Sequence, residues 1–213
     1  MVRVRRGLAA LVVALVGGVL AGCTGGGSDM PGLTASPTVS ATPTPTPTPT
    51  ATAEEFTDEP GVVFDFSDPD LQLVFEDVPR ELTGDAADVH NAIALWTRES
   101  WRSITTNEVS PYLYEASSAD ALTAVEDDVA LNVENGNTVG GPHRVTISDI
   151  VVDGETATGT ACRDYTEGTF VNANGSHDPA DVGFGEPFAI TYTLLNRGGG
   201  VWWIESVIKD GTC

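Results

Sequence analysis

Basic side chains are scarce in this sequence. Lysine and arginine together number 10 against 31 aspartate and glutamate residues, so the 213-residue chain carries a formal net charge of −21. A surface of this sign repels nucleic acid, which excludes nucleic acid as a partner. The acidic residues are scattered, and the densest runs, Glu54-Glu55 and Glu126-Asp127-Asp128, lack the spacing of a calcium loop. The acidity is therefore interpreted as a source of solubility.

Long apolar runs are also missing, apart from one short segment near the start. This segment follows Arg3, Arg5 and Arg6, and its length of about 14 residues is too short to span a bilayer, which is typical of an export signal. It ends in Leu20-Ala21-Gly22-Cys23, which resembles the lipobox of bacterial lipoproteins. The resemblance implies cleavage after residue 22, attachment of acyl chains such as palmitate to Cys23, and a lipid-anchored protein on the extracytoplasmic face of the cell membrane. The alternative is an ordinary secretory signal followed by an unmodified Cys23. Arg5-Arg6 is only weak evidence for the twin-arginine export route, so the sequence does not decide between the Sec and twin-arginine routes.

Cysteine is rare as well, with three residues in the chain. Once Cys23 is assigned to lipid, Cys162 and Cys213 remain, and an even pair in an exported domain most simply forms a disulfide. A redox or metal-binding role is disfavoured because no CxxC spacing and no neighbouring histidine accompany them. The sequence thus predicts one disulfide, no metal site and no cofactor.

Residues 24–53 lack large apolar side chains and are rich in Gly, Ser, Thr and Pro, with alternating Thr and Pro from Thr42 to Thr50. Alternating proline keeps the backbone near polyproline II, so this segment predicts an extended tether. The predicted organisation is a signal peptide at 1–22, a lipidated Cys23 with its linker at 23–53, and a single domain at 54–213.

The first half of this domain has a helical period. Val89, Ile93 and Trp96 fall on one stripe of a long helix that starts after Thr83, and Trp101 lies off the stripe, which predicts a second contact surface. The side chain of Arg98 is predicted to face away from this apolar stripe. Two shorter helices are predicted, one starting at Ser110-Pro111 with Ser110 as its cap, the other capped by Ser117 and ending at Asn135-Gly136.

The second half is rich in strand-like runs separated by turn signals. These runs are Val145–Val152, Thr156–Tyr165, Thr169–Asn172, Phe188–Leu195 and Val201–Ile208. In the last run Trp202, Ile204 and Ile208 are expected on one face and Trp203, Glu205 and Val207 on the other. Helices followed by close antiparallel strands predict an α+β fold in which the N-terminal helices pack on one face of a curved antiparallel β-sheet.

Several short segments resemble actinobacterial lipoproteins with an NTF2-like (cystatin-like) domain. They are the helical half and the segments Thr160–Tyr165, Trp202–Ser206 and Gly211–Cys213, within a region of similarity that runs from Asp85 to Cys213. The resemblance implies a strongly curved sheet that wraps a long helix into a cone, the wide end of which is often a pocket.

Four residues are candidates for ligand binding: His90, Trp96, Asp164 and Trp203. His90 flanks the apolar stripe and is either directed into the cone or a boundary histidine. Strand alternation places Asp164 on the face of Cys162 and Tyr165 on the opposite face, so Asp164 and Tyr165 are not expected to act on one substrate. His143 and His177 are expected to be solvated.

The sequence predicts a non-catalytic binding or accessory domain for a small apolar ligand or an envelope protein. The first alternative is an enzyme of the isomerase or dehydratase type with His90 or Asp164 as base, and the second is a passive surface lipoprotein. A cavity with apolar and aromatic walls, and with both residues outside it, would favour binding of an apolar ligand.

Overall fold

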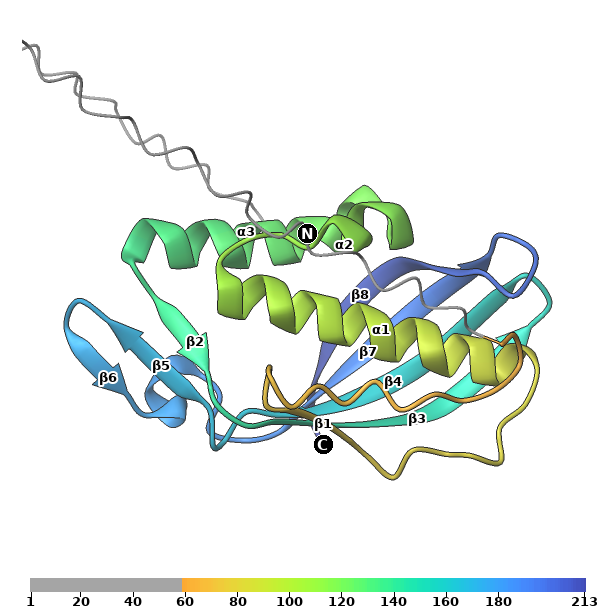
Figure 1. Ribbon diagram of the computed structural model, residues 1–213, viewed down its shortest axis with the longest axis horizontal. Helices are drawn as coiled ribbons and strands as arrows, with labels where there is room; N and C mark the ends of the chain where they lie inside the picture. The colour runs from red at the N-terminus through yellow and green to blue at the C-terminus, as the bar shows by residue number, and fades with distance from the viewer. Residues whose placement is uncertain (1–58) are drawn as a thin grey trace, which may run out of the picture. The chain divides into compact units, whose positions relative to one another are not determined.

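The long helix predicted after Thr83 is the central element of the domain. In the computed structural model, which describes residues 59–213, helix α1 (Asp85–Thr106) lies along one face of a curved sheet (Figure 1). Val89, Ile93 and Trp96 are buried as the helical period predicts, and Trp101 is buried as well. The second contact surface is confirmed, because α1 packs on the strands and on helix α3 (Ala119–Asn135).

The larger sheet has five strands. Their spatial order is β1 (Leu73–Glu76), β3 (His143–Asp153), β4 (Thr156–Asp164), β7 (Phe188–Asn196) and β8 (Trp202–Thr212). β3, β4, β7 and β8 are antiparallel to their neighbours as predicted, whereas β1 joins the edge parallel to β3. The α+β fold, with helices packed on a curved and mainly antiparallel sheet, is confirmed.

A second, small sheet lies at one end of the domain. It contains β2 (Thr138–Gly140), β5 (Thr169–Asn172) and β6 (Gly175–His177), and the short 3-10 helix η1 (Pro179–Val182) follows it (Figure 1). β5 is the strand predicted at the same residues. β2 and β6 are not predicted from the sequence, because three residues are too few to reveal an alternating pattern.

Irregularities in two strands interrupt the alternation of side chains. In β3 the pairing with β4 shifts between Ser148 and Val151, where Asp149 has a φ of 53°. In β8 the pairing with β7 shifts after Ile204, so that Glu205 is an extra residue. The predicted placement of Ile208 and Val207 is therefore wrong: Val207 packs against the core, whereas Ile208 is exposed.

The short helices begin close to where the sequence predicts them. α2 spans Pro111–Ala116, but the Ser110 hydroxyl donates to Glu99 at 2.7 Å and does not cap the helix. α3 is capped by Ser118, one residue later than predicted, because the Ser118 hydroxyl accepts from the Ala121 amide. Gly136 ends α3 in the left-handed conformation, as expected of a glycine after the last turn.

Charged side chains also enter the interior. Arg98, predicted to face away from the packed stripe, is buried instead and forms an ion pair of 2.9 Å with Glu99. The second carboxylate oxygen of Glu99 accepts from Ser110 and approaches Arg102 within 3.3 Å. Burial of Arg98 is thus compensated by a charged and hydrogen-bonded partner.

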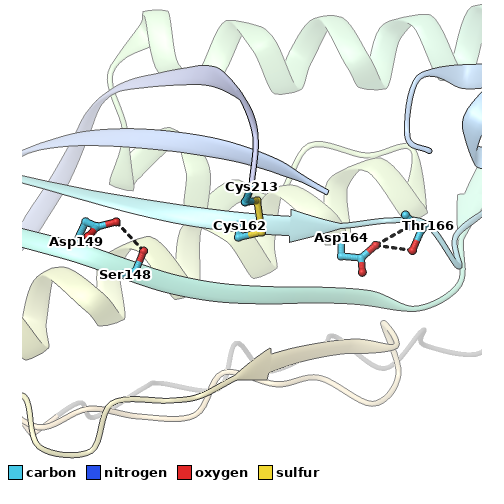
Figure 2. The surroundings of a disulfide bond; sticks show 6 residues. All are labelled: Ser148, Asp149, Cys162, Asp164, Thr166 and Cys213. Carbon is cyan, nitrogen blue, oxygen red and sulfur yellow. Dashed lines mark hydrogen bonds between the residues drawn. A yellow bond between two sulfur atoms is a disulfide. The ribbon is translucent and has the colours of Figure 1, made fainter. Parts of the chain in front are cut away.

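The predicted disulfide joins Cys162 on β4 to Cys213, with 6.0 Å between their Cα atoms (Figure 2). Cys162 lies on the face of β4 opposite the buried Ala161 and Arg163, so the bond fastens the chain beyond β8 to the outer face of the sheet. Cys23, the signal segment and the tether lie outside the described residues. Among residues 59–213, no helix is long and apolar enough to cross a membrane.

Candidate functional site

A cavity of about 620 Å³ lies where helix α3, the end of the larger sheet and the small β2-β5-β6 sheet meet. α3 runs into β2 at this end of the domain, β5 lies beside β2, and β6 lies beside β5 (Figure 1). The volume is in the range of pockets that enclose small organic ligands. The cavity is therefore the candidate functional site.

Aromatic and aliphatic side chains form most of the cavity wall. Tyr165 is the centre of an aromatic cluster, since its ring lies 5.2 Å from that of Trp101, 5.2 Å from that of Phe184 and 5.5 Å from that of Phe188. Phe170 continues the cluster by stacking on Phe184 at 5.2 Å. All five residues line the cavity, so an apolar molecule inside it would contact a nearly continuous aromatic wall.

Arg163 is the buried charge of the cavity. Its side chain is 5% exposed and enters from β4, on the same face as Tyr165. Nη2 donates to the Tyr192 hydroxyl at 2.6 Å and to the Thr97 hydroxyl at 3.2 Å, and Nη1 donates to the Tyr165 hydroxyl at 3.4 Å. Burial acts to lower the pKa of Arg163, but the two tyrosines outweigh it and raise the pKa, so the guanidinium stays charged.

Asp128 and Lys209 place the remaining full charges at the exposed part of the wall. Partial burial, aided by the neighbouring Asp127, raises the pKa of Asp128, while Arg163 acts in the opposite direction. The Lys209 ammonium lies 3.9 Å from the centre of the Phe188 ring. The wall thus combines two cations with one carboxylate.

His90 and Trp96 are both buried on α1, but neither lines the cavity. Burial lowers the pKa of His90, and its Nδ1 atom has no hydrogen-bond partner among residues 59–213. The interpretation of His90 as a boundary or surface residue is wrong, because its side chain is 2% exposed. Trp96 contacts the Tyr192 ring edge-on at 5.6 Å, and the centre of its ring lies 5.9 Å from the Arg163 guanidinium.

Asp164 and Trp203 also lie away from the cavity. Asp164 shares the outer face of β4 with Cys162, as the alternation predicts, and accepts from the Thr166 amide and hydroxyl at 2.8 and 2.7 Å (Figure 2). Desolvation acts to raise the pKa of Asp164, but these hydrogen bonds outweigh it and lower the pKa. Trp203 is half-buried and stacks with Arg197 at 3.4 Å.

The other two histidines differ from the expectation that both are solvated. His143 is fully buried and stacks on Tyr165 at 4.1 Å, and burial, reinforced by Arg163, lowers its pKa well below the usual value. His177 is half-buried on β6, lines the cavity and forms a 3.0 Å hydrogen bond with Asn172. Across residues 59–213, no group of three or more His, Cys, Asp or Glu residues is arranged to hold a metal ion.

Arg163 was not predicted as a functional residue, although the sequence around it carries one signal. The alternation that puts Cys162 and Asp164 outside puts Arg163 inside with Ala161 and Tyr165. An arginine that shares the inward face of a central strand with apolar residues is unusual, because charged side chains are rarely buried unless they have a partner.

Solved structures that resemble this chain have low sequence identity to it and low TM-scores. No family model and no curated protein matches the chain. The intermembrane space region of chloroplast protein ARC6 is 12% identical, with a TM-score of 0.46, and the match covers 60% of this chain and 97% of that one. Kfla4162 from Kribbella flavida is 15% identical (TM-score 0.39; 59% of this chain and 91% of that one). A variant of Rv3472, a protein of unknown function from Mycobacterium tuberculosis, is 15% identical (TM-score 0.35; 57% and 72%).

Proposed function

We propose that the domain is a non-catalytic binding module for a small apolar molecule and that a lipid on Cys23 holds it at the outer face of the cell membrane. The observation that supports binding is the cavity of about 620 Å³ with a mainly apolar and aromatic wall. Such a wall gains free energy by removing apolar ligand surface from water. The lipid anchor is proposed from the lipobox-like segment that ends at Cys23.

Binding is better supported than the enzyme alternative because of where the two proposed bases lie. His90 and Asp164 are both outside the cavity, and Asp164 is on the opposite face of the sheet. A general base must come within hydrogen-bond reach of the proton it removes. Neither residue meets this condition for a molecule held in the cavity.

Native mass spectrometry of the full-length protein, purified from its own cells, tests the proposal. We expect a non-covalent mass excess of one small molecule that is lost after extraction with organic solvent, whereas a covalent lipid on Cys23 would survive the extraction. A protein that retains no small molecule and takes up no added apolar probe would contradict the proposal. Co-purification of an envelope protein in place of a small molecule would favour the protein-binding alternative.

Two alanines on α3 offer a matched pair of variants. Ala124 lines the cavity and Ala130 does not, and both are exposed on the same helix. We expect Ala124→Trp to lower the retained amount at least several-fold because the indole occupies the cavity, and Ala130→Trp to retain as much as the unchanged protein. Equal retention by the two variants would place the ligand elsewhere.

A further inference from the structure

We propose that the ligand of the cavity is an amphipathic anion, an apolar body that ends in a carboxylate, and that Arg163 and Tyr165 hold the carboxylate. This inference rests on the proposed binding function and specifies the class of molecule bound.

Arg98 and Arg163 are buried to a similar degree, but their charges are compensated differently. Arg98 has the Glu99 carboxylate at 2.9 Å. Arg163 has no carboxylate oxygen within ion-pair distance among residues 59–213. Its hydrogen bonds go to three hydroxyl groups, and its guanidinium lies 5.9 Å from the centre of the Trp96 ring. A buried cation without a counter-charge is costly, and an anion delivered by a ligand would remove that cost.

Arg163 also retains hydrogen-bonding capacity. A guanidinium has five N–H groups, and the three hydrogen bonds to Thr97, Tyr165 and Tyr192 use three of them. Nη1 has one remaining N–H beyond its long 3.4 Å contact, whereas Nε also has no partner within the described domain but is fully buried. Arg163 can therefore donate to a carboxylate and keep its hydrogen bonds to Thr97, Tyr165 and Tyr192.

Tyr165 supplies a second donor at the same place. Its hydroxyl oxygen accepts from Arg163, so its own proton is directed elsewhere, and Tyr165 lines the cavity. Burial raises the pKa of Tyr165, with Arg163 acting in the opposite direction, so the hydroxyl keeps its proton at neutral pH. A carboxylate at this point would accept from a neutral phenol and from a guanidinium.

The other charges of the cavity favour an anion over a cation. Lys209, the single lysine of the chain, and Arg163 outnumber Asp128, so the wall is net positive although the chain carries −21. Aromatic walls also bind organic cations, but the Lys209 ammonium already lies over the Phe188 ring. A ligand cation would meet two like charges there, whereas an anion meets complementary charge.

Equilibrium dialysis with three ligands that share one tail provides the test. The full chain in lipid nanodiscs is dialysed at pH 8 against empty nanodiscs, so that partition into lipid cancels, with dodecanoate, dodecanol or dodecyltrimethylammonium. We expect dodecanoate to bind at least about ten-fold more tightly than dodecanol, as a charge-assisted hydrogen bond predicts, and the ammonium compound to bind most weakly. This comparison requires no variant.

Variants then assign the preference to residues. Arg163→Gln should bring dodecanoate and dodecanol within about two-fold of each other, and Tyr165→Phe should reduce the preference in part. Arg197→Gln removes the same charge from an arginine outside the cavity and should leave the preference unchanged. Equal binding of the three ligands, or tighter binding of the cation, would overturn the anionic assignment while the proposed binding function stands. Binding of none of them would overturn both.

Discussion

Arg163 on β4 donates a hydrogen bond of 2.6 Å to the hydroxyl of Tyr192 on the neighbouring strand β7. Thr97 of α1 lies within 3.2 Å of both groups, so this cluster fastens the long helix to two central strands. The same contacts fix the direction in which the guanidinium meets the cavity. The polar cluster that joins α1 to the sheet therefore also positions the guanidinium that we propose to bind the ligand.

Replacement of Tyr192 by phenylalanine should destabilise the protein. The change keeps the ring that packs on Trp96 but leaves a buried guanidinium without its shortest hydrogen bond, which predicts a loss of about 1.5–3 kcal/mol in the free energy of unfolding. Urea denaturation measures the loss. Tyr114→Phe, on the exposed surface of α2, is the control and should have little effect. A Tyr192 variant as stable as the unchanged protein would show that the cluster contributes no net stability.

Stability should fall as the pH is lowered from 7 to 5. Burial keeps the pKa of His143 well below 6.5 and lowers that of His90, so the folded protein resists protonation where the unfolded chain accepts it. The contribution of each neutral histidine is fully present above about pH 6.5 and is lost on acidification, by at most about 1.4 kcal/mol per pH unit. Urea titrations at pH 7, 6 and 5 give the slope.

His143→Phe tests the assignment of this pH dependence. Neither nitrogen of His143 has a partner within the described domain, and the ring stacks on Tyr165, so phenylalanine preserves the stack and removes two unpaired buried atoms. The variant should lose less stability between pH 7 and pH 5 than the unchanged protein, with His90 responsible for the remainder. An identical slope in both proteins would contradict a role for His143.

The disulfide should contribute substantially to stability. Cys162 and Cys213 are 51 positions apart, for which loop-closure entropy predicts an upper value of about 4 kcal/mol. The double variant Cys162→Ser, Cys213→Ser should unfold at a lower urea concentration. Alkylation of denatured, unreduced protein followed by intact-mass measurement checks the bond directly, and two modified thiols on these residues in exported protein would argue against it.

Cys23→Ser tests the proposed anchor. Serine has no thiol to accept the lipid, so the variant should leave the membrane fraction or remain uncleaved. Cell fractionation with immunoblotting, and the mass of the N-terminal fragment, distinguish these results. A variant that is processed and retained like the unchanged protein would rule out lipidation at Cys23.

Periodic elements were predictable from sequence because their signals are local. The stripe through Val89, Ile93 and Trp96 defines α1, and the alternation around Cys162 defines the faces of β4. Burial of His143 was not predictable, because it depends on the packing of Tyr165 and Trp101, which are distant in sequence.

The residues of the cavity wall were not predictable from the sequence for a related reason. Its wall combines side chains from α1, α3, both sheets and the segment after η1, and no single stretch of sequence carries the pattern. Of the predicted ligand-binding residues, Trp96 lies beside a residue of the wall, since the centre of its ring is 5.9 Å from the Arg163 guanidinium. The wall residues themselves are brought together only by the fold.

The extra residue Glu205 in β8 determines which charge reaches the cavity. With it, Val207 and Lys209 pair with the inward residues Tyr192 and Ile190. If Glu205 were instead a regularly paired residue of the strand, strict alternation from Ile204 would turn Ile208 and Asp210 inward in their place. The electrostatic sign of this part of the wall is thus set by the bulge at Glu205. Regular pairing of Glu205 would replace the cation by a carboxylate without any substitution, whereas deletion of Glu205 would leave Lys209 inward.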